Sequence, residues 1–259
     1  MKITILVASH KQYNMPQDPI YRAIQVGAAV QDQQIEGFIP DNTGTNLSVK
    51  NPFYNELTAL YWAKYNLTDQ DVIGLAHYRR FLGRKSSHSY KDLLTDEEIE
   101  IALQKYDILL PKQRNYFIET QEEHYLNAHD NRPYNIMMDV ISKQFPEYLP
   151  ALTEFRKSRT AHMFNISIMP QVLFQDYTDF VFAVLSEVEK QTDFEQLDGQ
   201  DKRAMGYLGE RLMDVWVRTR QLKIAEYPLV TTEKTNWLEK GWYFLLRHFG
   251  HQQNTKTHF

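Results

Sequence analysis

Blocks of continuous hydrophobic residues alternate with amphipathic blocks along most of the chain. The runs ITILVA, at residues 3–8, and VIGLA, at residues 72–76, are typical of strands that are covered on both faces of a sheet. Further strands are expected in the segments 107–111, 162–170 and 223–230. Because the predicted strands alternate with predicted helices, the pattern favours an α/β fold with a mostly parallel central sheet flanked by helices.

The helical segments are marked by capping residues and by apolar positions three or four residues apart. In residues 51–66, Asn51 is expected as the N-cap and Pro52 as the first helical residue. Thr95 and Glu98 have the spacing of a capping box. Longer helices are predicted for residues 170–189, 201–220 and 236–249, and shorter helices, broken at Pro133, Pro146 and Pro150, for residues 113–160.

Length and composition restrict the class of protein. The 259 residues contain no repeat and no convincing linker, so we expect a single domain, residues 1–259. A net charge of −4 provides no overall basic field for nucleic acid, and no cysteine is present for thiol chemistry. The N-terminal apolar run is too short for a signal peptide, and no segment approaches the roughly 18 apolar residues of a membrane span. We therefore expect a cytoplasmic protein that binds no nucleic acid.

The strongest chemical signal follows the apolar run at residues 72–76. Residues 77–85 read HYRRFLGRK, which places five candidate cations in nine residues. Ligands bind at the carboxyl ends of parallel strands, and the planar fork of donors on arginine suits phosphate oxygens. The cluster is therefore a candidate site for a diphosphate group. The alternative is that Arg79 and Arg80 pair with carboxylates at the edge of the sheet.

The basic cluster is one of several motifs whose order and spacing are specific when taken together. They are ILVASHKQYNMP, YRAIQVG, DNTGTNLSVKNP, NELTALYWAKYN, HYRRF, YDILLPK, MFNISIMP and GYLGERLMDVW, and they cover most of the chain. In this set the chain resembles a bacterial family of capsular and exopolysaccharide glycosyltransferases with an HYRR motif, long described only as a domain of unknown function. The resemblance implies a GT-A-like fold, in which about residues 1–112 bind the donor nucleotide and about residues 113–259 form the acceptor side and C-terminal helices.

The same resemblance implies an activity and its partners. Enzymes of this kind pass a sugar, in some members galactofuranose, from a nucleotide sugar to a growing glycan. For this chain we expect a hexosyltransferase with a UDP-linked donor, carrying galactose or galactofuranose, and a glycan or lipid-linked glycan acceptor. The expected products are capsular polysaccharide or exopolysaccharide.

Many GT-A enzymes bind Mn²⁺ or Mg²⁺ through an Asp-x-Asp motif at a strand end. The one such triplet here, at residues 69–71, precedes the predicted strand at residues 72–76 and is expected to be a turn. Our hypothesis is that fixed basic residues replace the metal by stabilising charge on the diphosphate. These residues are His77, Tyr78, Arg79 and Arg80. No metal ion or other cofactor is expected, and a divalent metal, Mn²⁺ or Mg²⁺, is the alternative.

Four polar residues of the first motifs are assigned to the donor by the resemblance. Ser9 and His10 end the first strand, where GT-A enzymes hold the nucleotide, although His10 reads equally as a surface loop residue. Asp41 and Asn46 lie in a polar loop that would hydrogen-bond donor hydroxyls or, in the alternative, form a plain turn.

Later motifs add residues near the donor. Asn55 and Glu56 sit in the first turns of the helix predicted at residues 51–66, near its positive end. Glu56 either complements the helix dipole or positions a residue of the basic cluster. In related folds a polar residue at the position of Asn165 faces the transferred sugar, and the alternative is a hydrogen-bonded core asparagine.

The segment at residues 203–216 carries the candidate catalytic base. An inverting transferase needs a carboxylate to take the proton of the acceptor hydroxyl. Glu210 is our candidate, with Arg211 or Arg203 holding it or the phosphate, and Tyr207 is assigned to the acceptor on the same face. The alternative is a solvent-exposed helix face with paired charges.

Two other segments are assigned to the acceptor side. His129 and Asp130 are expected to contact the acceptor or, in the alternative, the donor sugar. A metal site is disfavoured, because the five-residue separation of His124 and His129 is poor spacing for two ligands on one helical face. Residues 236–251 combine aromatic and basic side chains that would rest on the inner face of the cell membrane, where lipid-linked glycans are assembled. The alternative for this last helix is packing on the domain.

Two other functions compete with transfer for the whole protein. A noncatalytic GT-A-like partner of polysaccharide assembly would keep the fold, and the missing metal motif is consistent with it. A nucleotide-sugar hydrolase or a nucleotidyltransferase would turn over its substrate without a glycan acceptor.

Overall fold

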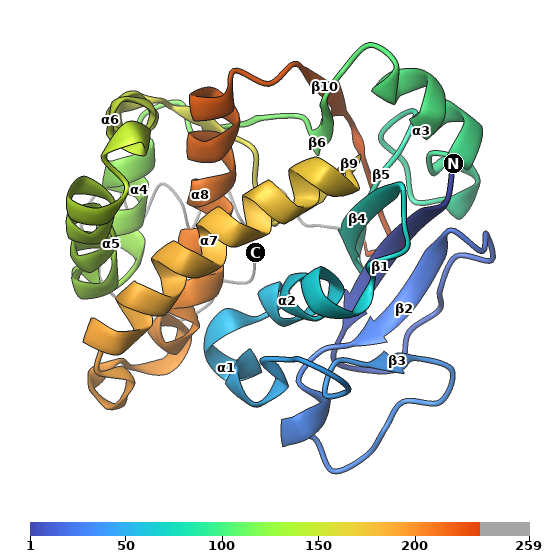
Figure 1. Cartoon of the computed structure of the whole chain (residues 1–259), viewed down its shortest axis with the longest axis horizontal. Coiled ribbons are helices and arrows are strands. Elements are labelled where there is room, and N and C mark those ends of the chain that lie inside the picture. Colours follow the sequence, from blue (N-terminus) through green and yellow to red (C-terminus); the bar gives the residue numbers. More distant parts are fainter. Residues whose placement is uncertain (234–259) are drawn as a thin grey trace.

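The computed structural model describes residues 1–233, in which a nine-stranded sheet forms the centre (Figure 1). Its strands are β1 (Ile3–Ser9), β2 (Tyr21–Gln25), β3 (Ile39–Pro40), β4 (Val72–His77), β5 (Arg80–Leu82), β6 (Ile108–Pro111), β9 (Ser167–Pro170), β10 (Ile224–Tyr227) and β11 (Leu229–Thr231). A separate pair is formed by β7 (Arg114–Asn115) and β8 (Thr160–Ala161).

The main row of strands has the order β10-β6-β9-β4-β1-β2-β3. β1 is parallel to β2 and β4, β2 is parallel to β3, and β6 is parallel to β10. Only β9 in this row runs the opposite way, antiparallel to β4 and β6. The α/β fold with a mostly parallel sheet that the sequence predicts is therefore confirmed.

Helices cover both faces of the sheet. They are α1 (Asn51–Tyr54), α2 (Leu57–Asn66), α3 (Asp96–Leu103), α4 (Gln121–Ala128), α5 (Asn131–Gln144), α6 (Leu149–Lys157), α7 (Gln171–Gln191) and α8 (Ala204–Arg220). In β1, Leu6 and Ala8 join the core under α2, α7 and α8, whereas Ile5 and Val7 join the core under α3. Figure 1 shows α4, α5 and α6 beyond α7 and α8, as a further layer of helices on one side of the sheet.

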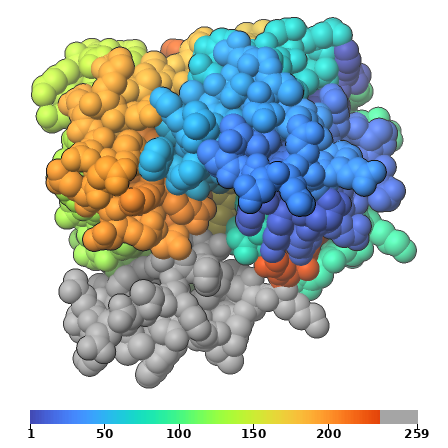
Figure 2. Space-filling model, turned by 90° about the horizontal axis from the view of Figure 1, so that it is seen from below, coloured from blue at the N-terminus to red at the C-terminus, as the bar shows by residue number. Residues whose placement is uncertain are grey.

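The two halves expected from the sequence lie in contact. α1 packs on α8, and α2 packs on α7. Figure 2 shows the surface of the N-terminal segments, in blue, continuing directly into that of α7 and the start of α8, in orange. Residues from both halves therefore can line one site.

The helix predicted for residues 51–66 is divided in the structure. α1 ends at Tyr54, Asn55 has a φ of 52°, and α2 begins at Leu57. The predicted N-cap, Asn51, is already helical and follows the cap residue, while its side-chain Nδ2 donates to the carbonyl of Asn55 at 2.8 Å. The same carbonyl also accepts the Thr58 N–H at 3.2 Å, so it remains hydrogen-bonded at the break.

Other boundaries also differ from the prediction. The strand predicted for residues 223–230 is two strands, β10 and β11, divided at Pro228, which has no N–H to donate to a ladder. Asn165 precedes β9 and has a φ of 53°, so it is not a strand residue. Pro133 lies inside the first turn of α5, where a missing N–H costs nothing, and it breaks no helix.

The local capping prediction is confirmed. Thr95 accepts a hydrogen bond from the Glu98 N–H, and the Glu98 side chain accepts one from the Thr95 N–H. Within residues 1–233, none of the helices has the length and apolar character needed to cross a membrane. The helix predicted for residues 236–249, and its membrane contact, lie outside the described residues.

Candidate active site

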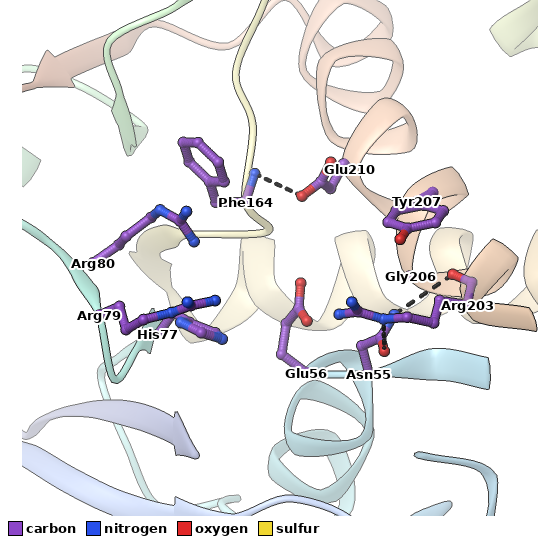
Figure 3. A pocket seen from close by; sticks show the side chains of 10 residues that line it. All are labelled: Asn55, Glu56, His77, Arg79, Arg80, Phe164, Arg203, Gly206, Tyr207 and Glu210. Atoms are coloured by element: carbon purple, nitrogen blue, oxygen red, sulfur yellow. Dashed lines mark hydrogen bonds between the residues drawn. The ribbon is translucent and has the colours of Figure 1, made fainter. Parts of the chain in front are cut away.

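A polar pocket opens where β4 ends, between the two halves of the chain (Figure 3). It is lined by residues from the α1–α2 break, the β4–β5 turn, the segment before β9 and the start of α8. These residues are Asn55, Glu56, His77, Arg79, Arg80, Phe164, Arg203, Gly206, Tyr207 and Glu210. The structure thus brings together six of the residues assigned from the sequence, namely Asn55, His77, Arg79, Arg80, Tyr207 and Glu210.

One wall of the pocket is basic. His77 pairs with Arg80 across the antiparallel β4–β5 connection, and Arg79 lies in the turn between them. The Arg80 guanidinium lies 4.4 Å from the centre of the Phe164 ring, and it forms no salt bridge with any carboxylate of residues 1–233. Arg79 pairs with Glu233 at 3.3 Å, with both side chains partly exposed. The sheet-edge ion pair that was the alternative explanation therefore applies to Arg79 and not to Arg80.

His77 contributes a neutral ring to this wall. Burial first, and then the charges of Arg80 and Arg79, hold the pKa of His77 well below its ordinary value. Its Nδ1 atom is buried and has no hydrogen-bond partner among the described residues. The positive charge of the wall therefore comes from the two arginines, and the hypothesis of a cationic His77 is wrong at neutral pH.

The opposite wall carries two carboxylates. Glu56 Oε1 accepts a hydrogen bond from Asn165 Nδ2 at 2.8 Å, and Glu210 Oε1 accepts one from the Phe164 N–H at 3.0 Å. Burial first, and then the negative charge of Glu56, raise the pKa of Glu210 to about 7, against the opposing effects of Arg211 and the Phe164 N–H. Glu210 can therefore exchange a proton near neutral pH, as a general base must.

The floor between the walls is fixed by Arg203 and its partners. The Arg203 Nε donates to Asn55 Oδ1 at 2.8 Å, and its Nη1 donates to Gln200 Oε1 at 3.2 Å. The Tyr207 hydroxyl also donates to Gln200 Oε1, at 3.2 Å. A Cβ at Gly206 would collide with the Asn55 side chain, which explains the glycine at this position.

Three predicted donor residues lie beside the pocket rather than in its lining. The buried Tyr78 ring contacts His77, with ring centres 4.5 Å apart, and meets His10 edge-on at 5.5 Å. Burial first, and then Lys11 and Arg79, lower the pKa of His10. Ser9 is buried, and its hydroxyl donates to the Lys11 carbonyl at 2.7 Å. Of the three, only His10 is exposed for contact with a ligand.

The structure contradicts the donor role assigned to Asp41. Its carboxylate is fully buried and accepts hydrogen bonds from the N–H groups of Gly27 and Ala28, at 2.9 and 3.0 Å, and from the hydroxyls of Ser48 and Thr58. These four donors occupy its acceptor sites, so Asp41 cannot hold a sugar hydroxyl.

Asn46, the other residue assigned in that loop, also has a structural position. Its Oδ1 accepts the Ser48 N–H at 3.1 Å and its Nδ2 donates to the Gly44 carbonyl at 2.9 Å. Asn46 does not line the pocket, so the plain turn that was the alternative describes this residue.

Asn165 supports the pocket from behind. It is buried, and its Nδ2 donates to Glu56 and, at 3.3 Å, to the carbonyl of Gly206. Its Oδ1 is buried without a hydrogen-bond partner in the described part of the chain. These contacts favour the alternative reading, a hydrogen-bonded core asparagine, over a direct contact with the transferred sugar.

The two residues assigned to the acceptor, His129 and Asp130, have different surroundings in the structure. His129 stacks on the pocket residue Tyr207, with ring centres 4.3 Å apart, and its Nδ1 lies 3.2 Å from Asp201 Oδ1. Asp130 caps α5 by accepting the Arg132 N–H, and it also pairs with the Arg132 side chain at 2.7 Å. Thus His129 is adjacent to the pocket, whereas Asp130 has a capping role.

Arg211 does not line the pocket. It is buried, its Nη1 donates to the Tyr207 carbonyl at 2.8 Å, and its guanidinium lies 4.7 Å from the centre of the Tyr125 ring. The direct contact with phosphate proposed for Arg211 is therefore not available. Its positive charge still acts on the neighbouring Glu210.

Three pocket residues carry little or no signal in the sequence. The sequence indicates for Glu56 only a helix-dipole or positioning role, and the motif NELTALYWAKYN contains it without indicating that the helix breaks there. Nothing in the sequence marks Phe164 or Gly206 as a pocket residue, because an aromatic residue near a strand and a glycine on a helix have many ordinary explanations. Only the fold shows that Phe164 lies against Arg80 and that Gly206 approaches the break at Asn55.

The residues present do not fit the metal site found in many GT-A enzymes. The acidic triplet at residues 69–71 lies at the amino end of β4, where Asp71 Oδ2 accepts the Lys2 N–H at 2.6 Å. Within residues 1–233, no group of three or more histidine and acidic side chains is arranged to hold a metal ion. At the carboxyl end of β4 the side chains are imidazole and guanidinium, whereas hard divalent cations prefer several oxygen ligands.

Comparison with known proteins gives two matches of this fold. The family described as a domain of unknown function, DUF4422, matches residues 4–221. The apo structure of WbbM, a bifunctional glycosyltransferase, is similar, with a TM-score of 0.82 and 27% sequence identity over 90% of this chain. The match covers 46% of the WbbM chain, so this chain spans about half the length of WbbM. No protein with a curated description matches. The glycosyltransferase-like fold expected from the sequence is confirmed by these matches.

Proposed function

The chain belongs to the DUF4422 family, and from this premise we propose that it is a glycosyltransferase that uses a nucleotide sugar. The observation that carries the proposal is the pocket at the end of β4, in which two arginines face two carboxylates. A donor diphosphate needs positive charge, and an acceptor hydroxyl needs a proton acceptor. The similarity to the glycosyltransferase WbbM supports the same class of reaction.

In this proposal Arg79 and Arg80 bind the diphosphate of the donor. Arginine donors fit phosphate oxygens in a bidentate manner, and Arg80 has no carboxylate partner to displace within residues 1–233. As the bond between the anomeric carbon and the diphosphate breaks, its electron pair moves to the diphosphate oxygen, where fixed positive charge stabilises it. The two guanidinium groups thus take the role that a divalent metal has in many enzymes of this fold.

Glu210 is the proposed general base of an inverting transfer. The acceptor oxygen attacks the anomeric carbon from the side opposite the diphosphate, and its proton passes to the Glu210 carboxylate. The raised pKa of about 7 makes this carboxylate a better proton acceptor than an ordinary glutamate. Tyr207 presents a ring beside it on which an acceptor sugar can stack, and the buried ring of His129 packs against Tyr207 and supports it.

The finer features of the substrate are proposed from the family resemblance. We propose UDP as the nucleotide, galactose or galactofuranose as the sugar, and a capsular or exopolysaccharide glycan, free or lipid-linked, as the acceptor. The cytoplasm, with peripheral contact at the inner face of the membrane, is the compartment where such donors are available.

The experiment that tests this function is calorimetric binding of UDP, with and without EDTA, to three proteins. These are the wild type, the variant with Arg79→Ala and Arg80→Ala, and the control Arg84→Ala. Arg84 belongs to the same HYRRFLGRK segment, but it pairs with Glu98 and does not line the pocket. We expect UDP binding that is unchanged by EDTA, at least tenfold weaker in the double variant and unchanged in the control.

Three results would contradict the proposal. Absence of UDP binding to the wild type in both conditions would remove UDP as the nucleotide. Transfer activity that disappears in EDTA and returns with Mn²⁺ would show that the arginines do not replace a metal. Rapid turnover of a nucleotide sugar without any acceptor would instead identify a hydrolase.

A further inference from the structure

The two carboxylates of the pocket are held by consecutive residues of one short segment. The Phe164 N–H donates to Glu210, and the side chain of the next residue, Asn165, donates to Glu56. Both residues have left-handed backbone conformations, with φ values of 80° and 53°. Two adjacent non-glycine residues in this region are uncommon, and such conformations persist where the surrounding structure requires them. The segment therefore fixes Glu56 and Glu210 relative to each other.

Placing two carboxylates in one pocket has a chemical consequence. Like charges at close range disfavour each other, so one group of such a pair binds a proton more readily. The surroundings differ between the two: the Glu56 carboxylate receives a side-chain amide N–H, whereas burial and the charge of Glu56 both raise the pKa of Glu210. The pair is therefore asymmetric, as expected when two carboxylates have different roles.

We propose that Glu56 is a second functional carboxylate of the pocket, whose negative charge, fixed by Asn165, makes Glu210 the stronger proton acceptor. This inference deepens the proposed function and rests on it for the identity of the proton donor, the acceptor hydroxyl. Glu56 is here a positioning residue that acts through Glu210. The helix-dipole role considered for Glu56 does not explain its hydrogen bond to Asn165 or its place in the pocket.

Other charged and titratable groups face Glu210 and must be considered with Glu56. Arg80, across the pocket, and Arg211, on the same helix, both favour the ionised form of Glu210. Tyr177 on α7 and Tyr207 on α8 are neutral at physiological pH, since burial raises the pKa of both. Asp214, one turn further along α8, is paired with His162. Glu56 is the negative charge that raises the pKa of Glu210, so its removal has a predictable sign.

The direct test is a carboxyl ¹³C NMR titration of the full-length protein with ¹³C-labelled glutamate. The Glu210 signal is assigned as the one that disappears in Glu210→Gln. In the wild type we expect a midpoint near 7, and in Glu56→Gln a midpoint moved toward the ordinary value of 4.5. Glu56→Asp keeps the charge and is expected to keep the elevated midpoint. Glu154→Gln, at an exposed carboxylate outside the pocket, is the control and should leave the midpoint unchanged.

The outcomes separate this inference from the proposed function. A wild-type Glu210 midpoint near 4.5, or an unchanged midpoint in Glu56→Gln, overturns the inference, whatever the activity. If the midpoints move as expected but no nucleotide sugar supports transfer, the carboxylate pair is upheld and the proposed function fails. Where transfer is measured, the acidic limb of its pH–rate profile should move to lower pH in Glu56→Gln by the same interval as the NMR midpoint. An acidic limb that stays in place would show that Glu56 does not act through Glu210.

Discussion

The Arg203 Nε donates a hydrogen bond to Asn55 Oδ1 at 2.8 Å, and this contact joins residues that are 148 positions apart in the chain. Asn55 makes it from a backbone with φ 52° and ψ −133°, a conformation that glycine adopts readily and other residues rarely do. Figure 3 shows the pair next to Glu56, on the side away from His77, Arg79 and Arg80. The Asn55 side chain therefore holds Arg203 in position, whereas the strained Asn55 backbone lowers the stability of the fold.

Two substitutions at Asn55 separate these contributions. Asn55→Gly removes the strain, on the order of 1 kcal/mol, and also the anchor of Arg203. We expect its free energy of unfolding to be equal to or above that of the wild type, while UDP binds several-fold more weakly. Asn55→Ala removes the anchor and keeps the strain, so it should be less stable than Asn55→Gly. Urea unfolding and calorimetry measure the two effects, and equal stability of the glycine and alanine variants would contradict the strain argument.

A second prediction concerns Asp41, whose carboxylate accepts four hydrogen bonds in the core. In Asp41→Asn an amide NH₂ replaces one of the acceptor oxygens and faces groups that are themselves donors. Leaving buried donors unsatisfied typically costs about 1–3 kcal/mol each, so we expect this isosteric change to reduce the free energy of unfolding by roughly 3 kcal/mol.

The measurement for Asp41 is urea unfolding together with UDP affinity. UDP affinity measured under conditions where the variant is folded should be near that of the wild type, because the carboxylate does not reach the pocket. Asn46→Ala serves as a comparison from the same loop and should lose much less stability. If Asp41→Asn is as stable as the wild type and binds UDP more weakly, Asp41 takes part in donor binding after all.

The strands and their order of appearance could be predicted because burial on both faces demands continuous apolar runs such as residues 3–8. The position of His77–Arg80 followed from the same reasoning, since it depends only on where a strand ends. The break at Asn55 could not be predicted. The helical pattern continues through it, and the groups that stabilise it, Arg203 and Gly206, are distant in sequence.

Polar residue type alone also did not show which way a side chain faces. Asp41 and Arg80 are both charged residues at the end of an apolar stretch, yet one is fully buried in a set of N–H and O–H donors and the other lines the pocket. The difference lies in partners contributed by other segments, such as Gly27 and Thr58 for Asp41. Such partners are set by the tertiary fold and leave no local signal.

A third prediction concerns a buried histidine between two acids. His162 Nδ1 lies 2.6 Å from Asp214 Oδ1, and its Nε2 lies 3.0 Å from Glu226 Oε1. Burial lowers the pKa of His162, but the hydrogen bonds and charges of Asp214 and Glu226 together outweigh it, so the net shift is upward from 6.5. A raised pKa in the folded state means that the charged ring stabilises the fold below pH 6.5, and that this contribution is lost as the pH rises through the folded-state pKa.

His162→Gln should remove this part of the pH dependence. Between about pH 5.5 and pH 8.5 we expect the free energy of unfolding of the wild type to fall more than that of the variant. His88→Gln, at an exposed histidine, is the control and should follow the wild type. Parallel curves for His162→Gln and the wild type would show that His162 binds its proton equally in the folded and unfolded states.

The last prediction is that the proposed base lowers the stability of the protein at the pH where it works. The pKa of Glu210 is raised from 4.5 to about 7, so folding favours its protonated form. Its contribution is fully present below about pH 4.5 and is lost as the pH rises through 7. Glu210→Gln keeps an oxygen for the Phe164 N–H and carries no charge. The variant should therefore be more stable than the wild type at about pH 8, by on the order of 2 kcal/mol, and nearly equal to it at about pH 4.

The same variant should lose transfer activity by roughly 10²-fold or more, because an amide cannot accept the proton of the acceptor hydroxyl. Urea unfolding at the two pH values and initial transfer rates at about pH 8 test the two halves of the prediction together. Glu154→Gln, which removes an exposed carboxylate, should change neither quantity. If Glu210→Gln is less stable than the wild type at about pH 8, the buried charge of Glu210 does not destabilise the folded state. A variant that keeps most of its turnover would exclude Glu210 as the base, because the amide of glutamine cannot take the proton in its place.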